Sequence, residues 1–208
     1  MLKENDFIEI DYVARIKDDG IFDLTREDVA KENNLYNPKT KYKPVIVCIG
    51  KGDVIMGLDK SLIGKETGSK YVVKISPEEG FGKKENGLIK LLPTKEFTKQ
   101  NVKPILGMHL DMGGIMGKII SVTGGRTLVD FNNPLSGRDL VYEVDIKREV
   151  IDKKEKLIGF LDIALRDYKL DFDNDEATIT GKIQPEIKKK LEKEIKERIK
   201  ISKITFNE

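Results

Sequence analysis

Side chains that could carry acid–base, metal or nucleophilic chemistry are few and scattered in this sequence. His109 is the only histidine and Cys48 the only cysteine. A zinc site or a histidine-based triad therefore has almost nothing from which to be built. The serines lie in no nucleophile-elbow context either. We expect no metal, no cofactor and no covalent catalysis.

Two stretches imitate ligand-binding motifs and then break them. Gly50-Lys51-Gly52 lies between a strand pattern and a helical pattern, as in a dinucleotide loop, but the third glycine would fall at Ile55. Residues 171–175 carry alternate aspartates like the first ligands of an EF-hand loop. Glu176 then stands where the turn glycine belongs, and Lys182 where the bidentate glutamate belongs. We therefore expect a tight turn at the first stretch and no calcium at the second.

The composition indicates a globular chain without a charged binding face. Of the 208 residues, 38% are apolar and 36% charged, which excludes disorder and allows one large domain or two to three small ones. The formal net charge of +2 favours neither a nucleic-acid nor a membrane partner. The longest apolar run, Val45 to Ile49, is far too short to span a membrane, and no signal-peptide core is visible. We expect a cytoplasmic protein with an inert, buried thiol at Cys48.

Alternating apolar residues predict strands that must position whatever site exists. They are expected at residues 7–16, 21–24, 45–49, 70–75 and 140–146, with the segment 45–49 buried on both faces. Thr25 is placed to cap a short helix. Asp53 is placed to cap another, which Gly64 ends.

The remaining segments predict two further small units. Between about residues 84 and 131, short apolar runs are separated by Gly-Gly pairs at 113–114 and 124–125, which are hairpin signals. After residue 150 come a helical face from Leu157 to Tyr168, a strand at 178–183, an amphipathic helix opened by Pro185 and a last strand at 201–206.

The order and spacing of several motifs resemble the FKBP-type peptidyl-prolyl cis-trans isomerases. These motifs are Tyr12, Phe22-Asp23, the stretch from Gly50 to Leu58 followed by Gly64 and Gly68, the turn Glu79-Gly80-Phe81-Gly82, and Tyr142. The insertion after Phe81 resembles the IF (insert-in-flap) domain of the SlyD subgroup. The segment after residue 150 resembles the extra C-terminal domain of long-chain archaeal members.

The resemblance implies an α+β fold in three parts. An FKBP-like twisted antiparallel sheet with a short helix would be formed by residues 1–83 and 132–150. A small β-rich IF domain would span residues 84–131, and a small α+β domain residues 151–208.

The resemblance also implies a proline pocket that works without acid, base or nucleophile. Its catalytic residues would be Tyr12, Asp23, Ile55 (through its backbone N–H) and Phe81, with the Tyr12 hydroxyl holding Asp23 in place. Substrate would further contact Phe22, Val45, Val54, Leu58 and Tyr142. Leu58 stands where many members carry tryptophan, and Phe81 where tyrosine usually supplies a hydroxyl. The alternative for these aromatic residues is ordinary core packing against a small sheet.

The insertion carries more apolar residues than so small a unit can bury, including three of the five methionines. Adaptable methionine-rich surfaces suit promiscuous binding. The predicted chaperone surface consists of Leu91, Leu92, Phe97, Met108, Met112, Ile115, Met116 and Ile119, although about half of these must form the unit's own core.

The expected partners are accordingly unfolded or proline-containing polypeptides. A holdase-type chaperone with little or no isomerase activity is the alternative, and a small-molecule binder using the Gly50 loop is a third. Because a C-terminal domain of about 55 residues buries little surface alone, a homodimer through that domain is also predicted.

Overall fold

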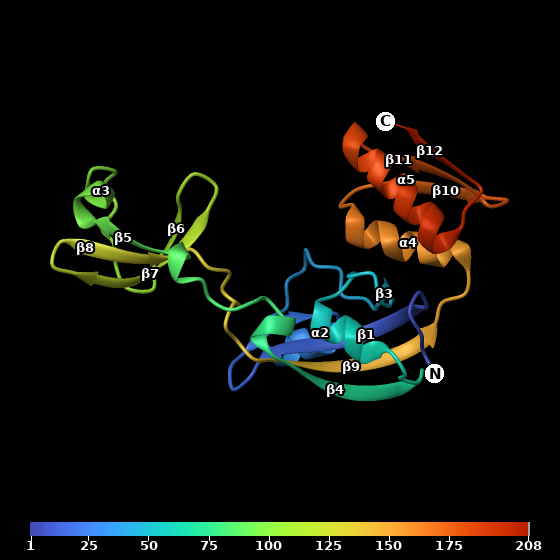
Figure 1. Ribbon diagram of the computed structural model, residues 1–208, viewed down its shortest axis with the longest axis horizontal. Helices are drawn as coiled ribbons and strands as arrows, with labels where there is room; N and C mark the ends of the chain where they lie inside the picture. Colours follow the sequence, from blue (N-terminus) through green and yellow to red (C-terminus); the bar gives the residue numbers. More distant parts are fainter. Residues whose placement is uncertain (208) are drawn as a thin grey trace. The chain divides into compact units, whose positions relative to one another are not determined.

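The computed structural model describes residues 1–207, which divide into two compact units (Figure 1). One unit contains Met1–Ile75 together with the chain from Leu140 onward, and the other contains Ser76–Asp139. The second unit is therefore an insertion between two neighbouring strands of the first.

The larger sheet of the first unit is antiparallel and centred on β1 (Phe7–Ile16). Its path runs β2 (Ile21–Leu24), β1, β9 (Leu140–Glu149) and β4 (Ser69–Ile75), and β3 (Val45–Cys48) also pairs with β1. The predicted strands are thus present. Their inward residues are buried because successive side chains point to opposite faces. The short helix α2 (Met56–Leu62) packs beside β4 and buries its apolar face.

Strand β3 is less completely buried than its apolar sequence predicts. Val45 and Ile46 are half-buried, whereas Val47 and Cys48 are buried. The buried thiol is confirmed at Cys48, where burial raises the pKa to about 12. A thiol that stays protonated at neutral pH is a poor nucleophile, so Cys48 acts as a packing residue.

The predicted cap at Thr25 is wrong. Helix α1 (Glu27–Glu32) begins after Arg26 and has no side-chain cap. The Thr25 hydroxyl instead donates to the Asp11 carboxylate at 2.7 Å and accepts the Tyr12 backbone N–H at 2.9 Å. A threonine near a strand edge can satisfy the neighbouring strand rather than the helix that follows it.

The predicted cap at Asp53 is also wrong. Helix α2 begins after Ile55, which is its N-cap residue and supplies no side-chain hydrogen bond. The Asp53 carboxylate folds back to accept the Cys48 backbone N–H at 2.8 Å. It therefore fixes the turn after β3 rather than the start of the helix.

The C-terminal part of the first unit is a three-stranded sheet with two helices. The helices are α4 (Lys153–Ala164) and α5 (Pro185–Ile199), which lie against each other (Figure 1). The sheet runs β10 (Lys169–Asp173), β11 (Glu176–Thr180), β12 (Lys203–Asn207), with β12 parallel to β11. The two predicted helices are present, and the two predicted strands correspond to β11, which ends already at Thr180, and β12. Strand β10 was not predicted, because its alternate aspartates gave the segment the pattern of a calcium-binding loop.

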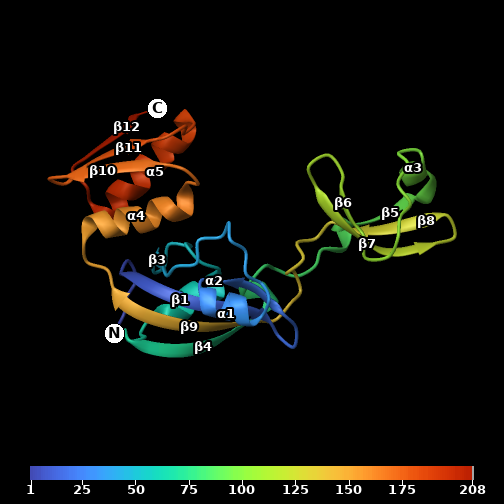
Figure 2. The ribbon, with the colours of Figure 1, turned by 180° about the vertical axis from the view of Figure 1, so that it is seen from behind.

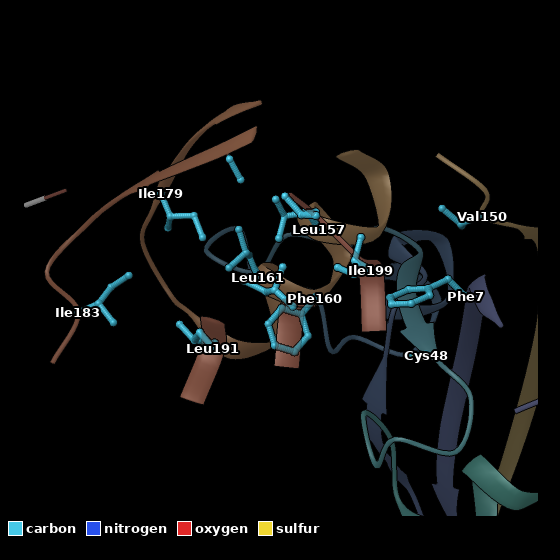
Figure 3. Packing of buried hydrophobic residues seen from close by; sticks show 13 residues of the cluster. Phe7, Cys48, Val150, Leu157, Phe160, Leu161, Ile179, Ile183, Leu191 and Ile199 are labelled. Carbon is cyan, nitrogen blue, oxygen red and sulfur yellow. The ribbon is translucent and has the colours of Figure 1, made fainter. Parts of the chain in front are cut away.

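This C-terminal part shares one hydrophobic core with the larger sheet. Phe7, Cys48 and Val150 are buried in the same cluster as Leu157 and Leu161 of α4 (Figure 3). Helix α4 packs on β3, and Gly159 lies so near Ile46 that a Cβ atom there would come within 2.4 Å of the Ile46 Cβ. Glycine permits this approach because it has no side chain.

The second unit contains a four-stranded antiparallel sheet (Figure 2). Its order is β5 (Ile89–Pro93), β8 (Arg126–Asp130), β7 (Met116–Thr123), β6 (His109–Asp111), with the short helix α3 (Thr94–Thr98) after β5. Two single 3₁₀ turns, Pro77–Glu79 and Asn86–Leu88, precede it. The Gly-Gly pairs at 113–114 and 124–125 form the predicted hairpin turns, with positive φ at all four glycines. No helix in the described part of the chain is long and apolar enough to cross a membrane.

The contact at Gly159 leads to a stability prediction. Gly159→Ala should lower the free energy of unfolding by about 1–3 kcal/mol, because α4 must move away from β3. A decrease in the free energy of unfolding is informative, because alanine in a helix interior is otherwise about 1 kcal/mol more favourable than glycine. Chemical denaturation measures the change.

The matched control is Gly20→Ala. A Cβ atom at Gly20 would meet nothing within 4 Å, and its φ is not positive. Stabilisation by Gly159→Ala would contradict the close contact between helix and strand.

Candidate functional site

Three aromatic side chains gather on one face of the larger sheet. The ring centroids of Tyr12 and Tyr142 are 5.7 Å apart, and those of Phe22 and Tyr142 are 6.0 Å apart with an edge-on geometry. Tyr142 pairs with Ala14, two residues from Tyr12 on β1, so the two tyrosines are diagonal neighbours on the same face. The structure thus brings together three residues that are far apart in sequence.

A short hydrogen bond joins this cluster to Asp23. The Tyr12 hydroxyl donates to Asp23 Oδ2 at 2.7 Å, and Asp23 Oδ1 accepts the Leu24 backbone N–H at 2.9 Å. Both oxygens of the carboxylate are therefore held in place. This is the contact that the resemblance implied between Tyr12 and Asp23.

The two tyrosines remain neutral at physiological pH. Burial raises the pKa of Tyr12 far above its usual value, and the hydrogen bond to the Asp23 carboxylate raises it further. Burial also raises the pKa of Tyr142, with a smaller contribution from Asp23. Tyr12 is consequently a permanent donor, and neither phenol acts as a general base.

The loop after β3 leads to Ile55, another of the predicted site residues. Gly50 and Gly52 have φ of +79° and +72°, which other residues rarely adopt. Their backbone N–H groups donate to the two oxygens of Asp59 on α2, at 2.8 and 3.0 Å. A carboxylate thus already occupies the amides that would take a phosphate, which argues against a nucleotide at this loop. Asp59 was not predicted, although an aspartate in the helix directly after two glycines is an indication of such a turn.

The loop ends at Ile55, whose backbone N–H was predicted to meet substrate. Ile55 precedes α2, and its carbonyl accepts the Asp59 N–H at 3.0 Å. No residue from 1 to 207 accepts a hydrogen bond from the Ile55 N–H. The first amides of a helix point outward along its axis and are open to an acceptor from a ligand.

The other predicted pocket residues are placed as follows. Leu58 is buried on α2, and Val45 and Val54 are half-buried on β3 and in the loop. Phe81 belongs to the second unit, where its carbonyl accepts the Ser136 hydroxyl at 2.9 Å. The contact of these four residues with substrate stays a prediction.

This arrangement has the properties of a binding site for an apolar ring. Aromatic faces provide contact area, and Tyr12 with Asp23 provides a fixed polar edge. Both phenols stay neutral at physiological pH, so neither of them takes up a proton from a ligand.

Comparisons with known proteins agree with this geometry. Residues 1–98 match the family model described as FKBP-type peptidyl-prolyl cis-trans isomerase, and residues 90–135 match the model described as FKBP26, IF domain. The short-type peptidyl-prolyl cis-trans isomerase of Methanocaldococcus jannaschii is 34% identical over 147 residues, which cover 71% of this chain and 93% of that protein. The chain belongs to the FKBP-type peptidyl-prolyl cis-trans isomerases.

The isomerase is of the SlyD-like type with an IF domain. The SlyD protein of Haemophilus influenzae is 31% identical over 109 residues, which cover 50% of this chain and 56% of that protein. The SlyD protein of Vibrio cholerae is 28% identical over 137 residues, covering 64% and 67%. The family, the enzyme class and the α+β fold inferred from the sequence motifs are thereby confirmed.

The hydrogen bond between Tyr12 and Asp23 can be tested in this isomerase. Tyr12→Phe keeps the ring and removes the donor, so Asp23 loses one of its two fixed contacts. We expect kcat/KM for a proline peptide to fall roughly fivefold, which corresponds to about 1 kcal/mol for one hydrogen bond. A protease-coupled peptide assay measures it.

Tyr168→Phe is the control. Its hydroxyl also donates to a carboxylate, that of Asp162 at 2.8 Å, but it lies in the C-terminal part of the chain. Equal losses in the two variants would show that the Tyr12 contact has no special role in the reaction.

Proposed function

We propose that this isomerase twists X-Pro bonds by non-covalent stabilisation and binds unfolded segments at its IF domain. Rotation of an X-Pro bond must cross a barrier of about 18–20 kcal/mol, because the amide loses resonance when it is twisted. The twisted amide is less charge-separated than the planar one, so an apolar environment favours it. The neutral aromatic cluster around Tyr142 is the observation that supports this mechanism.

In this mechanism each polar group of the site has a positioning role. The aromatic faces hold the proline ring, while Tyr12 keeps Asp23 in one orientation. The Ile55 N–H donates to a substrate carbonyl and fixes one side of the bond that turns. The aliphatic residues Val45, Val54 and Leu58 complete the apolar wall, and a contact of Phe81 with the substrate stays a prediction. No proton relay is required, because no covalent bond is made or broken.

The IF domain supplies the proposed surface for unfolded segments. A groove of about 330 Å³ is lined by side chains that include Leu92, Leu110 and Met112, with Phe97 buried beside it. Further exposed apolar side chains of this unit are Leu91, Ile115 and Met116, which are 55%, 60% and 58% exposed. Exposed apolar residues gathered in so small a unit are typical of a binding surface.

Two residues of the predicted chaperone surface, Phe97 and Ile119, are buried. Ile119 is fully buried and forms the core of the IF domain with Phe97 and Val129. Met108 and Leu92 are half-buried and pack against this core. The alternation along β7 turns Ile119 inward and places Met116 at the exposed end of the strand.

The two activities reinforce each other through tethering. A client held at the IF domain keeps its prolines at high local concentration near the isomerase site. A cytoplasmic folding isomerase acting on unfolded, proline-containing chains is therefore the proposed role. Proline-peptide kinetics of the unaltered protein separate this role from the holdase alternative, which requires no acceleration of isomerisation.

The groove provides a test that separates binding from catalysis. Met112→Glu puts a charge into the groove, and we expect catalysed refolding of a proline-limited protein to slow about fivefold. Turnover of a short proline peptide should remain unchanged, because such a peptide needs no second site. Both rates are measured on the same preparation.

Val122→Glu is the matched control on the same domain. Val122 is 38% exposed and Met112 40% exposed, and Val122 does not line the groove. If both variants slow refolding equally, the loss reflects general charge effects and the groove has no part in client binding.

Dimerisation through the C-terminal domain stays a proposal. It was predicted because so few residues bury little surface by themselves. Part of that surface is buried within the chain, against Phe7, Cys48 and Val150. Edge strand β12 stays available for pairing with a second copy. A monomer mass in light scattering at high concentration would end this proposal.

A further inference from the structure

An arginine of the C-terminal helix α5 reaches the loop that leads to Ile55. Arg198 Nη1 lies 2.7 Å from Asp53 Oδ1, and the two side chains are only 11% and 8% exposed. The other end of the guanidinium, Nη2, donates to Glu194 at 2.6 Å and, more weakly, to the Lys51 carbonyl at 3.4 Å. Its carbon lies 5.2 Å from the centre of the Phe160 ring, so the group is held on several sides.

Asp53 transmits this contact to the backbone of the loop. Its second oxygen, Oδ2, accepts the Cys48 N–H at 2.8 Å, so the carboxylate ties the end of β3 to the turn. A buried carboxylate is costly unless it is paired and hydrogen-bonded. Asp53 is therefore kept inside by Arg198, and Ile55 follows only two residues later.

The loop has a separate anchor on its first half. Asp59 holds the Gly50 and Gly52 amides, whereas nothing beyond Asp53 fixes the segment before α2 by a side-chain hydrogen bond among the described residues. The orientation of the Ile55 N–H thus depends on where Asp53 lies. A misplacement of about 1 Å in a reacting or binding group can cost up to about a hundredfold in rate.

We propose that Arg198 is a positioning residue for the isomerase site. Through Asp53 it holds the segment 51–55 so that the Ile55 N–H is directed at the substrate carbonyl. The C-terminal domain thereby contributes to catalysis without touching the substrate. This inference rests on the proposed role of Ile55 as donor.

A purely structural role is a poor explanation of this ion pair. Apolar residues of α4, α5 and β11 already join the C-terminal part to the larger sheet. Replacing a buried ion pair by apolar side chains is often neutral for stability, so stability alone does not account for the pair. Here that geometry is imposed on the loop before the site.

The test uses Arg198→Met in the full chain, which keeps the stem and removes the charge. We expect kcat/KM for a proline peptide to fall roughly tenfold. We also expect the Ile55 amide resonance to shift in the free protein. The kinetics and the resonance are measured well below the midpoint temperature of unfolding, which is determined for each variant.

A second variant keeps the proposal testable if Arg198→Met unfolds. Adding Asp53→Asn removes the unpaired charge, and the asparagine carbonyl still accepts the Cys48 N–H. The double variant Asp53→Asn/Arg198→Met should regain most of the lost activity and the original Ile55 resonance. A folded double variant without that recovery would overturn the route through Asp53.

Glu155→Gln is the control. It breaks the 2.8 Å ion pair with Arg148, which also joins α4 to the larger sheet but lies away from the loop. We expect unchanged activity and an unchanged Ile55 resonance. Unchanged kinetics in Arg198→Met, or an equal loss in Glu155→Gln, would refute the inference.

Titration of the unaltered protein with a proline peptide distinguishes a wrong donor at Ile55 from a wrong role for Arg198. If the Ile55 amide does not respond, the proposed donor is wrong and this inference falls with it. If Ile55 responds but Arg198→Met changes nothing, the donor stands and only the role of Arg198 is rejected.

Discussion

The pairing of β1 with three other strands is the constraint on which the rest of the first unit depends. It pairs with β9 from Ile8 to Ile16, with β2 near its end and with β3 near its start. One end of β1 therefore joins Tyr12, Asp23 and Tyr142, and the other end carries Phe7 into the C-terminal core. A shift of register by one residue would turn both sets of side chains to the wrong face.

The C-terminal domain depends on β3 in the same way. Strand β3 is short, and only two of its four residues are fully buried. Helix α4 packs closely on it because Gly159 has no side chain. The same strand leads directly into the Gly50 turn and the start of α2. The contact of α4 with β3 and the conformation of the loop before α2 are thus properties of one continuous segment. This continuity explains how a domain that follows the isomerase sheet in sequence can influence the site.

Much of the fold and part of the site could be predicted from the sequence. The alternation from Phe7 to Ile16 and from Leu140 to Ile146 specifies strands because half-buried sheets require period two. The hydrogen bond of Tyr12 with Asp23 followed from the resemblance and is present. Aspartate and threonine gave the wrong predictions at Asp53 and Thr25. Their short polar side chains bind whichever backbone amide the tertiary structure presents, and local sequence does not reveal which.

Other features depend on contacts that no local pattern encodes. The partner of Arg198 lies 145 residues earlier in the chain, so the charge pattern of α5 by itself predicts only an exposed face. Ile119 was assigned to the surface because its hydrophobicity was clear but its direction was not. The direction follows from the pairing of β7 with β8, where the register shifts between Ile119 and Ser121. A bulge of this kind changes which residues face inward.

Three aspartates, Asp23, Asp53 and Asp59, are hydrogen-bonded to the backbone of the first unit. Asp23, Asp53 and Asp59 each accept at least one backbone N–H, from Leu24, Cys48 and the two loop glycines respectively. A carboxylate whose oxygens accept such hydrogen bonds is held in one orientation by the backbone. Tyr12 adds a second fixed contact to Asp23, and Arg198 adds one to Asp53. These carboxylates therefore fix the backbone at Leu24, at Cys48 and at the two loop glycines, a role that requires no proton transfer.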